Sequence, residues 1–322
     1  MKNFTKKLAA ISIGIFVALL FLEIACQALY AFMVAPQLES QKNDDLHYYE
    51  ANENPALTYS LRPGYHFTKK EKGRKDRRIN INKYGIRSDT DSTNAAQKVA
   101  LFGDSVPFGN GVSQEDSPPA CLQRLAGDSI HILNFGTPGY GLEELPHHLR
   151  AKYPVYRPQT LYYVLNLNDF SRRNTIYEGG DNGLYRIYNK PGLKLPFFIR
   201  KAVYRYIKEG KMSSVKWYKW LYEGNKKELL PLIKEMAGYA KSNGSVFKVV
   251  LFPAAVGYQN GHFALQGIFD EITRYCEKNG IPVIAPVAEF SQNVYKYQDI
   301  TDHFTPAGSE VIAKVIWEDM KG

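Results

Sequence analysis

Apolar and polar positions divide the 322-residue chain into three parts. After a short basic N-terminus, residues 8–34 are mostly apolar, residues 35–95 are polar and charged, and from residue 96 onward short apolar runs alternate with amphipathic helical patterns. Apolar runs bounded by turn residues that alternate with helical segments are typical of a parallel sheet covered by helices. The pattern predicts a membrane segment, a stalk with a β-rich arm, and one α/β domain over residues 96–322.

The alternation in the α/β domain predicts five strands with helices between them. The strands are expected at Lys98–Phe102, Ile130–Phe135, Thr160–Leu165, Phe247–Phe252 and Pro282–Ile284. The main helices are expected at Pro118–Leu125 (capped by Ser117), Leu142–Ala151, Lys226–Ser242, Phe263–Asn279 and Pro306–Met320. Such alternation implies a three-layer α/β/α fold with a five-stranded, parallel, flavodoxin-like sheet.

The first predicted strand ends abruptly at Gly103-Asp104-Ser105. A small residue there permits a sharp turn that lifts the following side chain clear of the core, as in other nucleophile turns. Ser105 is therefore a candidate nucleophile. An ordinary serine in a strand-end turn fits the same three residues, so other segments have to decide between the two interpretations.

Three further segments carry residues suited to acyl chemistry. Gly139 lies in a glycine-rich loop after the second strand, where open backbone N–H groups can meet a substrate oxygen. Asn168-Asp169 follows the third strand, and an asparagine amide can donate to an anionic oxygen without adding charge. His303 lies before the last helix and has acidic neighbours, Asp299 and Asp302. Taken singly, these are a turn glycine, a helix cap and a solvated histidine, but their order places all of them at the sheet edge where open α/β folds assemble sites.

In these segments the chain resembles the SGNH, or GDSL-type, hydrolase superfamily. The matching positions are Gly103-Asp104-Ser105, Gly139, Asn168-Asp169 and His303, and the resemblance covers about residue 96 to the C-terminus. Upstream, Asn82 to Arg87 resembles the N-x-x-G-x-R arm of bacterial members. The resemblance implies a serine esterase with Ser105 as nucleophile and His303 as base. The N–H groups of Ser105 and Gly139 and the side chain of Asn168 would form its oxyanion hole.

Two positions depart from the family pattern. The third block has Leu165-Asn166-Leu167 where a glycine usually precedes the asparagine, and the position three before the histidine, commonly aspartate, is Ile300. Asp299 would face His303 if the segment coils as a helical turn, whereas Asp302 would reach the ring from an irregular loop. We favour Asp302 and keep Asp299 as its rival. If neither matters, the site is a Ser-His dyad.

Lysines cluster before the apolar segment, and the next basic residue after it is Lys42. This asymmetry predicts a cytoplasmic tail at residues 1–7, a single transmembrane signal anchor at residues 8–34 in the inner membrane, and a catalytic domain facing the periplasm or exterior. Two alternatives to the anchor remain open. One is a signal peptide cleaved near Ala25 and Ala28, and the other is a lipoprotein modified at Cys26.

Charge and cysteine content limit the partners, disulfides and cofactors that the sequence predicts. The net charge is +9, but a domain outside the membrane should rarely meet nucleic acid, so no nucleic-acid partner is predicted. The three cysteines form no framework, although Cys121 and Cys276 could pair. No Cys/His cluster has metal-ligand spacing, so the sequence predicts neither metal nor cofactor.

Two basic segments have alternative interpretations. The run at residues 69–78 fits a solvated hairpin tip or a contact with anionic headgroups or glycans. The aromatic and basic insertion at residues 170–225 fits a helical cover on the core, or a lid that stacks sugars or rests on the membrane interface.

Together these features predict a membrane-anchored serine hydrolase that removes or transfers small O-acyl groups, with acylated glycans of the cell envelope as substrates. Cleavage of lipids or thioesters is the enzymatic alternative. A non-catalytic binding or assembly protein of the envelope is the alternative from another class. The sequence does not predict an oligomeric state.

Overall fold

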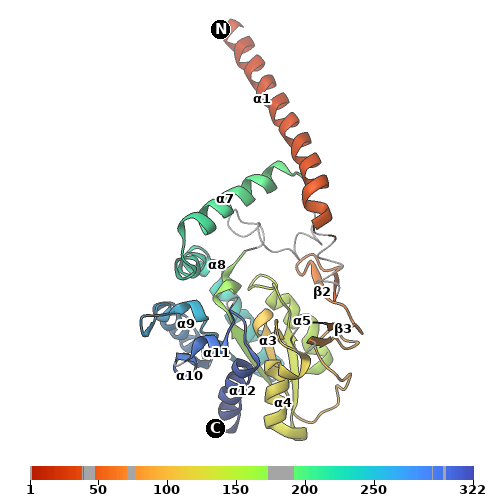
Figure 1. Ribbon diagram of the computed structural model, residues 1–322, viewed down its shortest axis with the longest axis vertical. Coiled ribbons are helices and arrows are strands. Elements are labelled where there is room, and N and C mark those ends of the chain that lie inside the picture. The colour runs from red at the N-terminus through yellow and green to blue at the C-terminus, as the bar shows by residue number, and fades with distance from the viewer. Residues whose placement is uncertain are drawn as a thin grey trace. The chain divides into compact units, whose positions relative to one another are not determined.

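The computed structural model describes residues 2–37, 39, 48–70, 77–172, 192–291, 293–299 and 302–322. The chain forms two compact units (Figure 1). The first comprises Met1–His47 and Arg173–Lys211, and the second comprises Tyr48–Arg172 and Met212–Gly322. The arm from Tyr48 onward and most of the predicted α/β domain belong to the second unit, called the catalytic unit below, whereas residues 173–211 of the predicted insertion belong to the first.

A five-stranded parallel sheet forms the centre of the catalytic unit. Its strands are β5 (Lys98–Gly103), β6 (His131–Gly136), β7 (Thr160–Leu165), β8 (Val246–Leu251) and β11 (Val283–Ile284). They lie in the order β11-β8-β7-β5-β6, and each neighbouring pair is parallel. The predicted flavodoxin-like sheet is thus confirmed, with strand ends displaced by at most about two residues, the usual uncertainty of such boundaries.

Helices cover both faces of this sheet. They are α4 (Pro118–Ala126), α5 (Leu145–Tyr156), α8 (Ser214–Ser242), α9 (Gln266–Lys278) and α12 (Pro306–Lys321). The chain passes from β5 outward to β6 and then back across to β7, β8 and β11, so right-handed crossovers place α4 opposite α5, α8 and α9. α12 packs against α4, and α8 packs against α5 and α9, which completes the three layers.

Short elements connect these layers. They are α3 (Ser105–Phe108), η2 (Gln114–Asp116), η3 (Gly127–Ser129), η4 (Leu167–Phe170), η5 (Ala255–Gly257), β9 (Tyr258–Gln259), β10 (His262–Phe263), α10 (Val287–Ser291) and α11 (Val294–Tyr297). Ser117 precedes α4 at the cap position as predicted. Its hydroxyl, however, donates to the Gln114 carbonyl at 2.9 Å instead of accepting from the helix.

α8 is longer than the sequence predicted. It begins at Ser214 rather than near Lys226, and the Ser213 hydroxyl accepts a hydrogen bond from the Lys216 N–H at 3.4 Å. Apolar and aromatic side chains recur along its first turns at helical spacing, and Val215, Tyr218, Leu221 and Tyr222 are buried. Lysines lie between these apolar positions, so the sequence pattern did not predict that the helix begins here. The last part of the predicted insertion, residues 214–225, is therefore part of a core helix.

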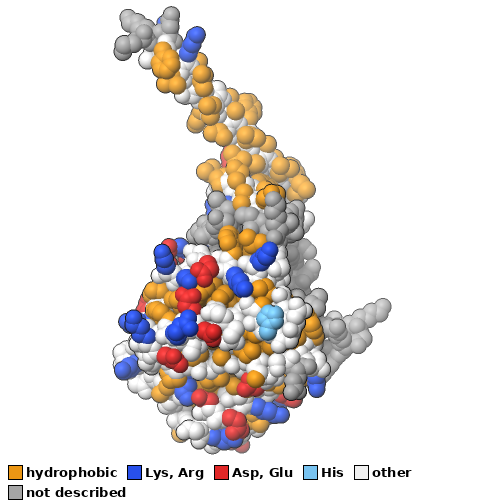
Figure 2. Space-filling model, turned by 90° about the vertical axis from the view of Figure 1, so that its left-hand side faces the viewer, with side chains coloured by type: hydrophobic (Ala, Val, Ile, Leu, Met, Phe, Trp, Pro, Cys, Tyr) orange, Lys and Arg blue, Asp and Glu red, His pale blue; other side chains and the backbone are white. Residues whose placement is uncertain are grey.

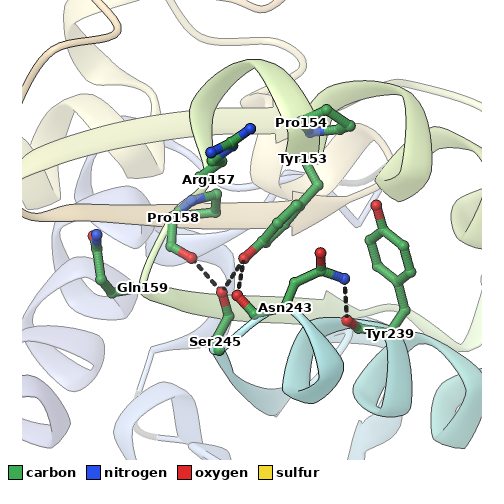
Figure 3. Close-up of a pocket in the computed structure, with 9 residues that line it drawn as sticks. Tyr153, Pro154, Arg157, Pro158, Gln159, Tyr239, Asn243 and Ser245 are labelled. Atoms are coloured by element: carbon green, nitrogen blue, oxygen red, sulfur yellow. Dashed lines mark hydrogen bonds between the residues drawn. The ribbon is translucent and has the colours of Figure 1, made fainter.

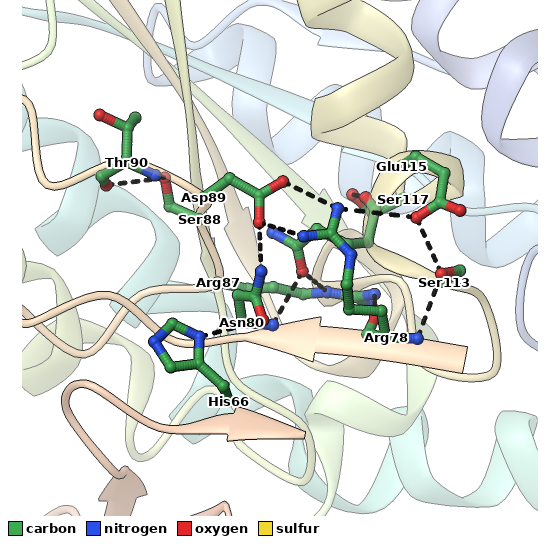
Figure 4. A network of polar contacts seen from close by, with 11 residues as sticks. His66, Arg78, Asn80, Arg87, Ser88, Asp89, Thr90, Ser113, Glu115 and Ser117 are labelled. Atoms are coloured by element: carbon green, nitrogen blue, oxygen red, sulfur yellow. Dashed lines mark hydrogen bonds and ion pairs between the residues drawn. The ribbon is translucent and has the colours of Figure 1, made fainter. Parts of the chain in front are cut away.

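The predicted arm consists of two antiparallel strand pairs, β1 (Tyr49–Ala51) with β2 (Tyr59–Leu61), and β3 (His66–Lys69) with β4 (Arg77–Asn80). The second pair flanks the basic run, of which residues 71–76 lie outside the described part. Arg78 reaches Asp89 with both guanidinium nitrogens, at 2.9 and 3.1 Å, on the exposed side of β4 (Figure 4).

The N-x-x-G-x-R motif shapes the turn after β4. The Asn82 side-chain oxygen accepts from the N–H groups of Tyr84 and Ile86, at 3.1 and 3.2 Å, which closes the turn. Gly85 within it has φ +70°, a conformation that glycine adopts without strain. The turn directs Arg87 into the protein, where its side chain is 2% exposed. The motif therefore delivers a buried guanidinium to the core.

His148 on α5 is buried beneath the loop that follows β6. Its Nε2 lies 3.0 Å from the Phe135 carbonyl, and its ring stacks on Phe102. Burial lowers the pKa of His148 from 6.5 to about 3, so the ring stays neutral in the fold. Between pH 6.5 and about pH 3, His148 is therefore protonated in the unfolded chain but neutral in the folded chain.

This difference predicts a loss of stability in acid. The His148 contribution is intact above pH 6.5 and decreases as the pH falls from 6.5 towards 3, which corresponds to about 2 kcal/mol lost at pH 5. Urea unfolding of the wild type and of His148→Gln at pH 7.5 and pH 5.0 measures the effect. The variant, whose amide can still donate to Phe135, should lose about 2 kcal/mol less on acidification. An identical pH dependence would show that His148 already titrates in the fold.

The first unit contains α1 (Lys2–Leu29), its continuation as a π-helical turn η1 (Tyr30–Val34), and α7 (Leu195–Lys211). Among the described residues, one helix is long and apolar enough to cross a membrane: Phe4–Gln37, with a mean hydropathy of 2.5 over its most apolar stretch. Exposed apolar side chains cover α1 along its length (Figure 2). Such a helix is compatible with a single-pass anchor or with a signal sequence.

Candidate active site

The turn after β5 sets the position of Ser105. Gly103 has φ +145°, and a Cβ at this position would lie 2.8 Å from the Val164 carbonyl oxygen on β7. Only glycine fits there, so the strand can turn sharply into α3. The Asp104 side chain caps α3 by accepting from the Val106 N–H at 2.9 Å. Ser105 is the first residue of this short helix and is 7% exposed.

His303, near the C-terminal end of the chain, contacts Ser105. Its Nε2 lies 2.9 Å from the Ser105 Oγ, although the two residues are 198 positions apart. The loop that carries His303 is tightly packed, because a Cβ at Gly308 would lie 1.9 Å from the Tyr297 carbonyl oxygen. The first turn of α12 therefore lies directly against the chain before the histidine.

The two candidate carboxylates differ in what they contact. Asp302 accepts from the Tyr218 hydroxyl at 3.1 Å through Oδ2 and from the Val256 N–H at 3.4 Å through Oδ1. Asp299 accepts from the backbone N–H of His303 at 3.2 Å through Oδ1. Its Oδ2 lies 3.7 Å from where a Cβ would stand on Gly111. Asp299 is thus tied to the backbone of the histidine and lies beside the loop after Ser105.

Electrostatics add to this contrast. Burial raises the pKa of Asp302, with the Tyr218 and Val256 donors and the nearby His303 opposing the shift. Asp302 has φ +58°, an uncommon conformation for a non-glycine residue, beside the histidine. Asp302 directly precedes His303 in the chain, and its two oxygens hydrogen-bond to residues of α8 and η5.

The third block separates into two roles. Asp169 is fully buried, and its Oδ2 accepts from the Tyr163 hydroxyl at 2.7 Å and from the Asn166 N–H at 3.2 Å. Burial, together with the charge of Asp104, raises the pKa of Asp169 well above its usual value, so this carboxyl caps η4 from inside the core. Asn168, by contrast, is exposed, and its side chain lies near the Asp104 carboxyl beside Ser105.

Gly139 lies in the turn after β6, on the exposed surface, with φ +82°. The arm braces this turn. The Tyr59 hydroxyl of β2 donates to the Pro138 carbonyl at 2.9 Å, and the Tyr140 hydroxyl donates back to the Tyr59 carbonyl. The β6 turn is also joined to the nucleophile strand, because the Thr137 N–H donates to the Gly103 carbonyl at 3.0 Å. Strand pairing thus brings the glycine loop beside the nucleophile turn.

Arg87 holds the loop that follows Ser105. Its guanidinium donates to the carbonyls of Phe108, Gly109 and Val112, at 3.0, 2.7 and 2.9 Å, and its Nε donates to Gln114 at 3.0 Å. Burial lowers the pKa of Arg87 to about 10, which still leaves it charged at neutral pH. The cation is stabilised by oriented carbonyl dipoles that belong to the loop between Ser105 and α4.

Four site residues were not identified from the sequence as part of the site chemistry. Asp104 accepts from the Ser105 hydroxyl at 3.2 Å, Asn110 has its Nδ2 3.5 Å from the His303 Nε2, and Arg87 and Tyr59 brace the two loops. Asp104 and Arg87 stood inside recognised motifs, which could have drawn attention to them. Asn110 and Tyr59 carry no such signal, since only the folded chain brings them to the site.

Two cavities lie away from Ser105. One, of about 490 Å³, is lined by residues such as Tyr153, Arg157 and Ser245 (Figure 3). It adjoins the first residues of β7 and β8, at the sheet edge opposite the nucleophile turn, and the Tyr153 and Ser245 hydroxyls lie 2.7 Å apart there. The other, of about 400 Å³, is lined by residues that include Arg87 and Asn134. Neither lining includes Ser105 or His303.

The described residues contain no group of three or more His, Cys, Asp or Glu side chains placed to hold a metal ion. Cys26, Cys121 and Cys276 are all free and buried, so the pairing of Cys121 with Cys276 that the sequence allowed is not formed.

No protein-family model matches the chain, and no curated protein matches its sequence. Several solved structures are similar to it. A member of the lipolytic protein G-D-S-L family from Veillonella parvula is 12% identical, with 69% of this chain and 97% of that one covered and a TM-score of 0.43. Esterase EstA from a Pseudoalteromonas species is 13% identical, with coverage of 70% and 97% and a TM-score of 0.43. A lipase/acylhydrolase from Enterococcus faecalis is 14% identical, with coverage of 70% and 96% and a TM-score of 0.45. In fold, the chain is similar to these hydrolases.

Proposed function

We propose that this chain is a membrane-anchored serine esterase that hydrolyses or transfers small O-acyl groups. The observation that carries the proposal is the 2.9 Å separation between the Ser105 Oγ and the His303 Nε2. A serine hydroxyl is a weak nucleophile at its own pKa and needs an adjacent base within hydrogen-bond reach. The imidazole of His303 occupies that position.

The proposed reaction has two halves. His303 takes the proton from Ser105 as the Oγ attacks the ester carbonyl, and it then returns the proton to the departing alcohol, which leaves an acyl group on Ser105. A water molecule then gives up its proton to His303 as it attacks the acyl carbonyl, and His303 passes that proton to the Ser105 Oγ as the acid is released, which regenerates the serine. If an alcohol of a glycan replaces this water, the product is a new ester and the enzyme is an acyltransferase.

The developing oxyanion needs donors that are already in place. The backbone N–H groups of Ser105 and Gly139 and the Asn168 amide are the proposed donors. Two features support this assignment: the Asn168 side chain lies near the Asp104 carboxyl beside Ser105, and the Gly139 turn is held by Tyr59. Fixed donors cost no reorganisation as the charge develops, and one such donor typically contributes about 3 kcal/mol.

The proposed substrates are small acyl esters on glycans of the cell envelope, with the catalytic unit outside the inner membrane. Lysines before the apolar helix and the length of that helix support this topology. Comparing p-nitrophenyl acetate with a long-chain p-nitrophenyl ester tests the acyl size. Faster turnover of acetate supports the proposal, and a preference for the long chain would favour the lipid hydrolase. Absence of labelling by a fluorophosphonate probe would favour the non-catalytic alternative.

The acid partner of His303 can be tested by two matched substitutions. Asp302 acts on the imidazolium through space, because its oxygens are bonded to Tyr218 and Val256. We therefore expect Asp302→Asn to lower kcat by about 10- to 100-fold, less than the ~10⁴-fold loss typical of a directly hydrogen-bonded acid. The measurement is kcat on p-nitrophenyl acetate. A loss of about 10³-fold or more in Asp299→Asn alone would identify Asp299 as the partner. Full activity in both variants would indicate a dyad.

A further inference from the structure

The two polar residues that interrupt the apolar segment both bind the start of α7. Glu23 accepts from the Lys194 N–H at 2.7 Å through Oε1 and from the Leu195 N–H at 2.8 Å through Oε2. Gln27 donates to the Gly192 carbonyl at 2.9 Å and also to Glu23. The first N–H groups of a helix have no partner within it, so Glu23 satisfies two of the groups that α7 leaves open.

Aromatic packing continues the contact one turn further along. Tyr30 meets Phe197 edge to face with ring centroids 5.4 Å apart, and the Lys194 Nζ lies 4.3 Å from the Tyr30 ring centre. Tyr30, Val34 and Phe197 form one buried cluster. Cleavage after Ala28 would remove Glu23 and Gln27 and leave the open end of α7 without these acceptors. The contacts therefore favour retention of the segment over its removal as a signal peptide.

The position of Glu23 along α1 gives the depth at which α7 begins. From Lys7 to Glu23 a helix rises about 24 Å at about 1.5 Å per residue, and the hydrocarbon core of a bilayer is about 30 Å thick. With Lys7 at the cytoplasmic surface, Glu23 lies inside the outer leaflet. α7 branches from this part of α1 (Figure 1) and therefore begins at the level of the membrane.

α7 presents an apolar stripe that turns away from this contact. Leu195, Ile199, Ala202 and Tyr206 recur at intervals of four, three and four residues, so they share one face of the helix. Ile199 and Tyr206 are 52% and 62% exposed. The sequence of α7 also carries five basic residues against the single acid Glu209. A basic helix with an apolar stripe is typical of segments that lie in the membrane interface.

We propose that α7 is a membrane-interface helix whose apolar stripe enters the outer leaflet of a bilayer that contains anionic lipid, with its first turn held to the anchor by Glu23. The basic residues of α7 match anionic headgroups. This inference rests on the proposed membrane anchoring and extends it, since the protein would meet the bilayer through two helices.

Spin labels on the full-length protein test the placement of the stripe. Ile199→Cys and Tyr206→Cys are labelled in vesicles of phosphatidylcholine and phosphatidylglycerol, with Lys201→Cys as the off-stripe control and the unsubstituted chain as the blank for its buried native cysteines. Collision rates are measured with oxygen, which concentrates in lipid, and with a neutral nickel chelate, which stays in water. We expect oxygen to dominate at positions 199 and 206 and nickel at position 201. Nickel access at 199 and 206 equal to that at 201 would overturn the proposal.

A second pair of variants tests the role of Glu23. Glu23→Leu keeps α1 apolar but removes both acceptors, so the label at position 199 should become severalfold more accessible to nickel. Phe21→Leu is the matched control, because Phe21 is on the same helix and 68% exposed. Equal nickel access in both variants would show that Glu23 does not hold α7.

Two further measurements separate this inference from the proposed function. The first is N-terminal sequencing of the vesicle-bound protein. A sequence that begins after residue 28 would overturn both the anchor and the interface helix. Fluorophosphonate labelling of the same sample reports the serine independently. If fluorophosphonate labels the protein but the apolar stripe is exposed to water, only the interface helix is overturned. If the stripe is buried in lipid but fluorophosphonate does not label the protein, only the esterase is overturned.

Discussion

Ser105→Ala is expected to abolish ester hydrolysis, with kcat on p-nitrophenyl acetate reduced by on the order of 10⁶-fold, the loss typical when a serine nucleophile is removed. The physical reason is that the Ser105 Oγ is the group that His303 can deprotonate at 2.9 Å. The residual rate would come from the oxyanion donors acting on a water molecule. Labelling by a fluorophosphonate probe should disappear in the same variant.

The matched control is Ser117→Ala. Its hydroxyl is also buried and also in the catalytic unit, but it donates to the Gln114 carbonyl away from His303. This variant should keep its fluorophosphonate labelling, and circular dichroism should show that both variants are folded. Wild-type turnover in a folded Ser105→Ala protein would refute the nucleophile assignment.

Arg87→Leu is expected to produce the largest loss of stability among single substitutions in the arm. It leaves the carbonyls of Phe108, Gly109 and Val112 without their buried donor, and such losses together typically cost about 3–5 kcal/mol. Thermal unfolding of the full-length protein in detergent should show a Tm lowered by roughly 10 °C. Turnover should decrease as well, since the released loop includes Asn110 beside His303.

Arg78→Ala is the control for the arm. Arg78 makes a two-pronged contact with Asp89, but the side chains are 43% and 51% exposed, and surface pairs of this kind contribute about 1 kcal/mol or less. A Tm change of only a few degrees is therefore expected. Similar Tm losses in Arg78→Ala and Arg87→Leu would mean that the buried carbonyls find water once the guanidinium is gone.

The sequence predicted the sheet well because parallel strands buried on both faces appear as unbroken apolar runs. β7, for example, has the bounds Thr160–Leu165 that were predicted. α8 was less predictable, since its first turns combine buried Tyr218 and Tyr222 with lysines that keep their charges outside. An aromatic residue among lysines fits a surface helix and a core helix equally well, and only packing against the sheet distinguishes them.

The sequence predicted the residues that meet at the candidate site, but not the residues that hold them in place. Ser105, Gly139, Asn168 and His303 follow strands or precede the last helix, and parallel strands bring such positions to one edge. The orientation of Asp299 and Asp302 was not predictable, because it depends on an irregular loop and on Tyr218 reaching across from α8. The brace by Tyr59 likewise depends on a contact 79 residues away in the chain.

The arm has a practical consequence for anyone wishing to work with a soluble fragment. Tyr59 and Arg87 hold the two loops beside Ser105. A fragment that begins at β5 would therefore lose both of these contacts, although it would keep every residue of the sequence blocks that resemble SGNH hydrolases. A fragment that begins at Tyr48 would carry the whole brace. Comparing the esterase activity of the two fragments would show how much of the proposed activity depends on the arm.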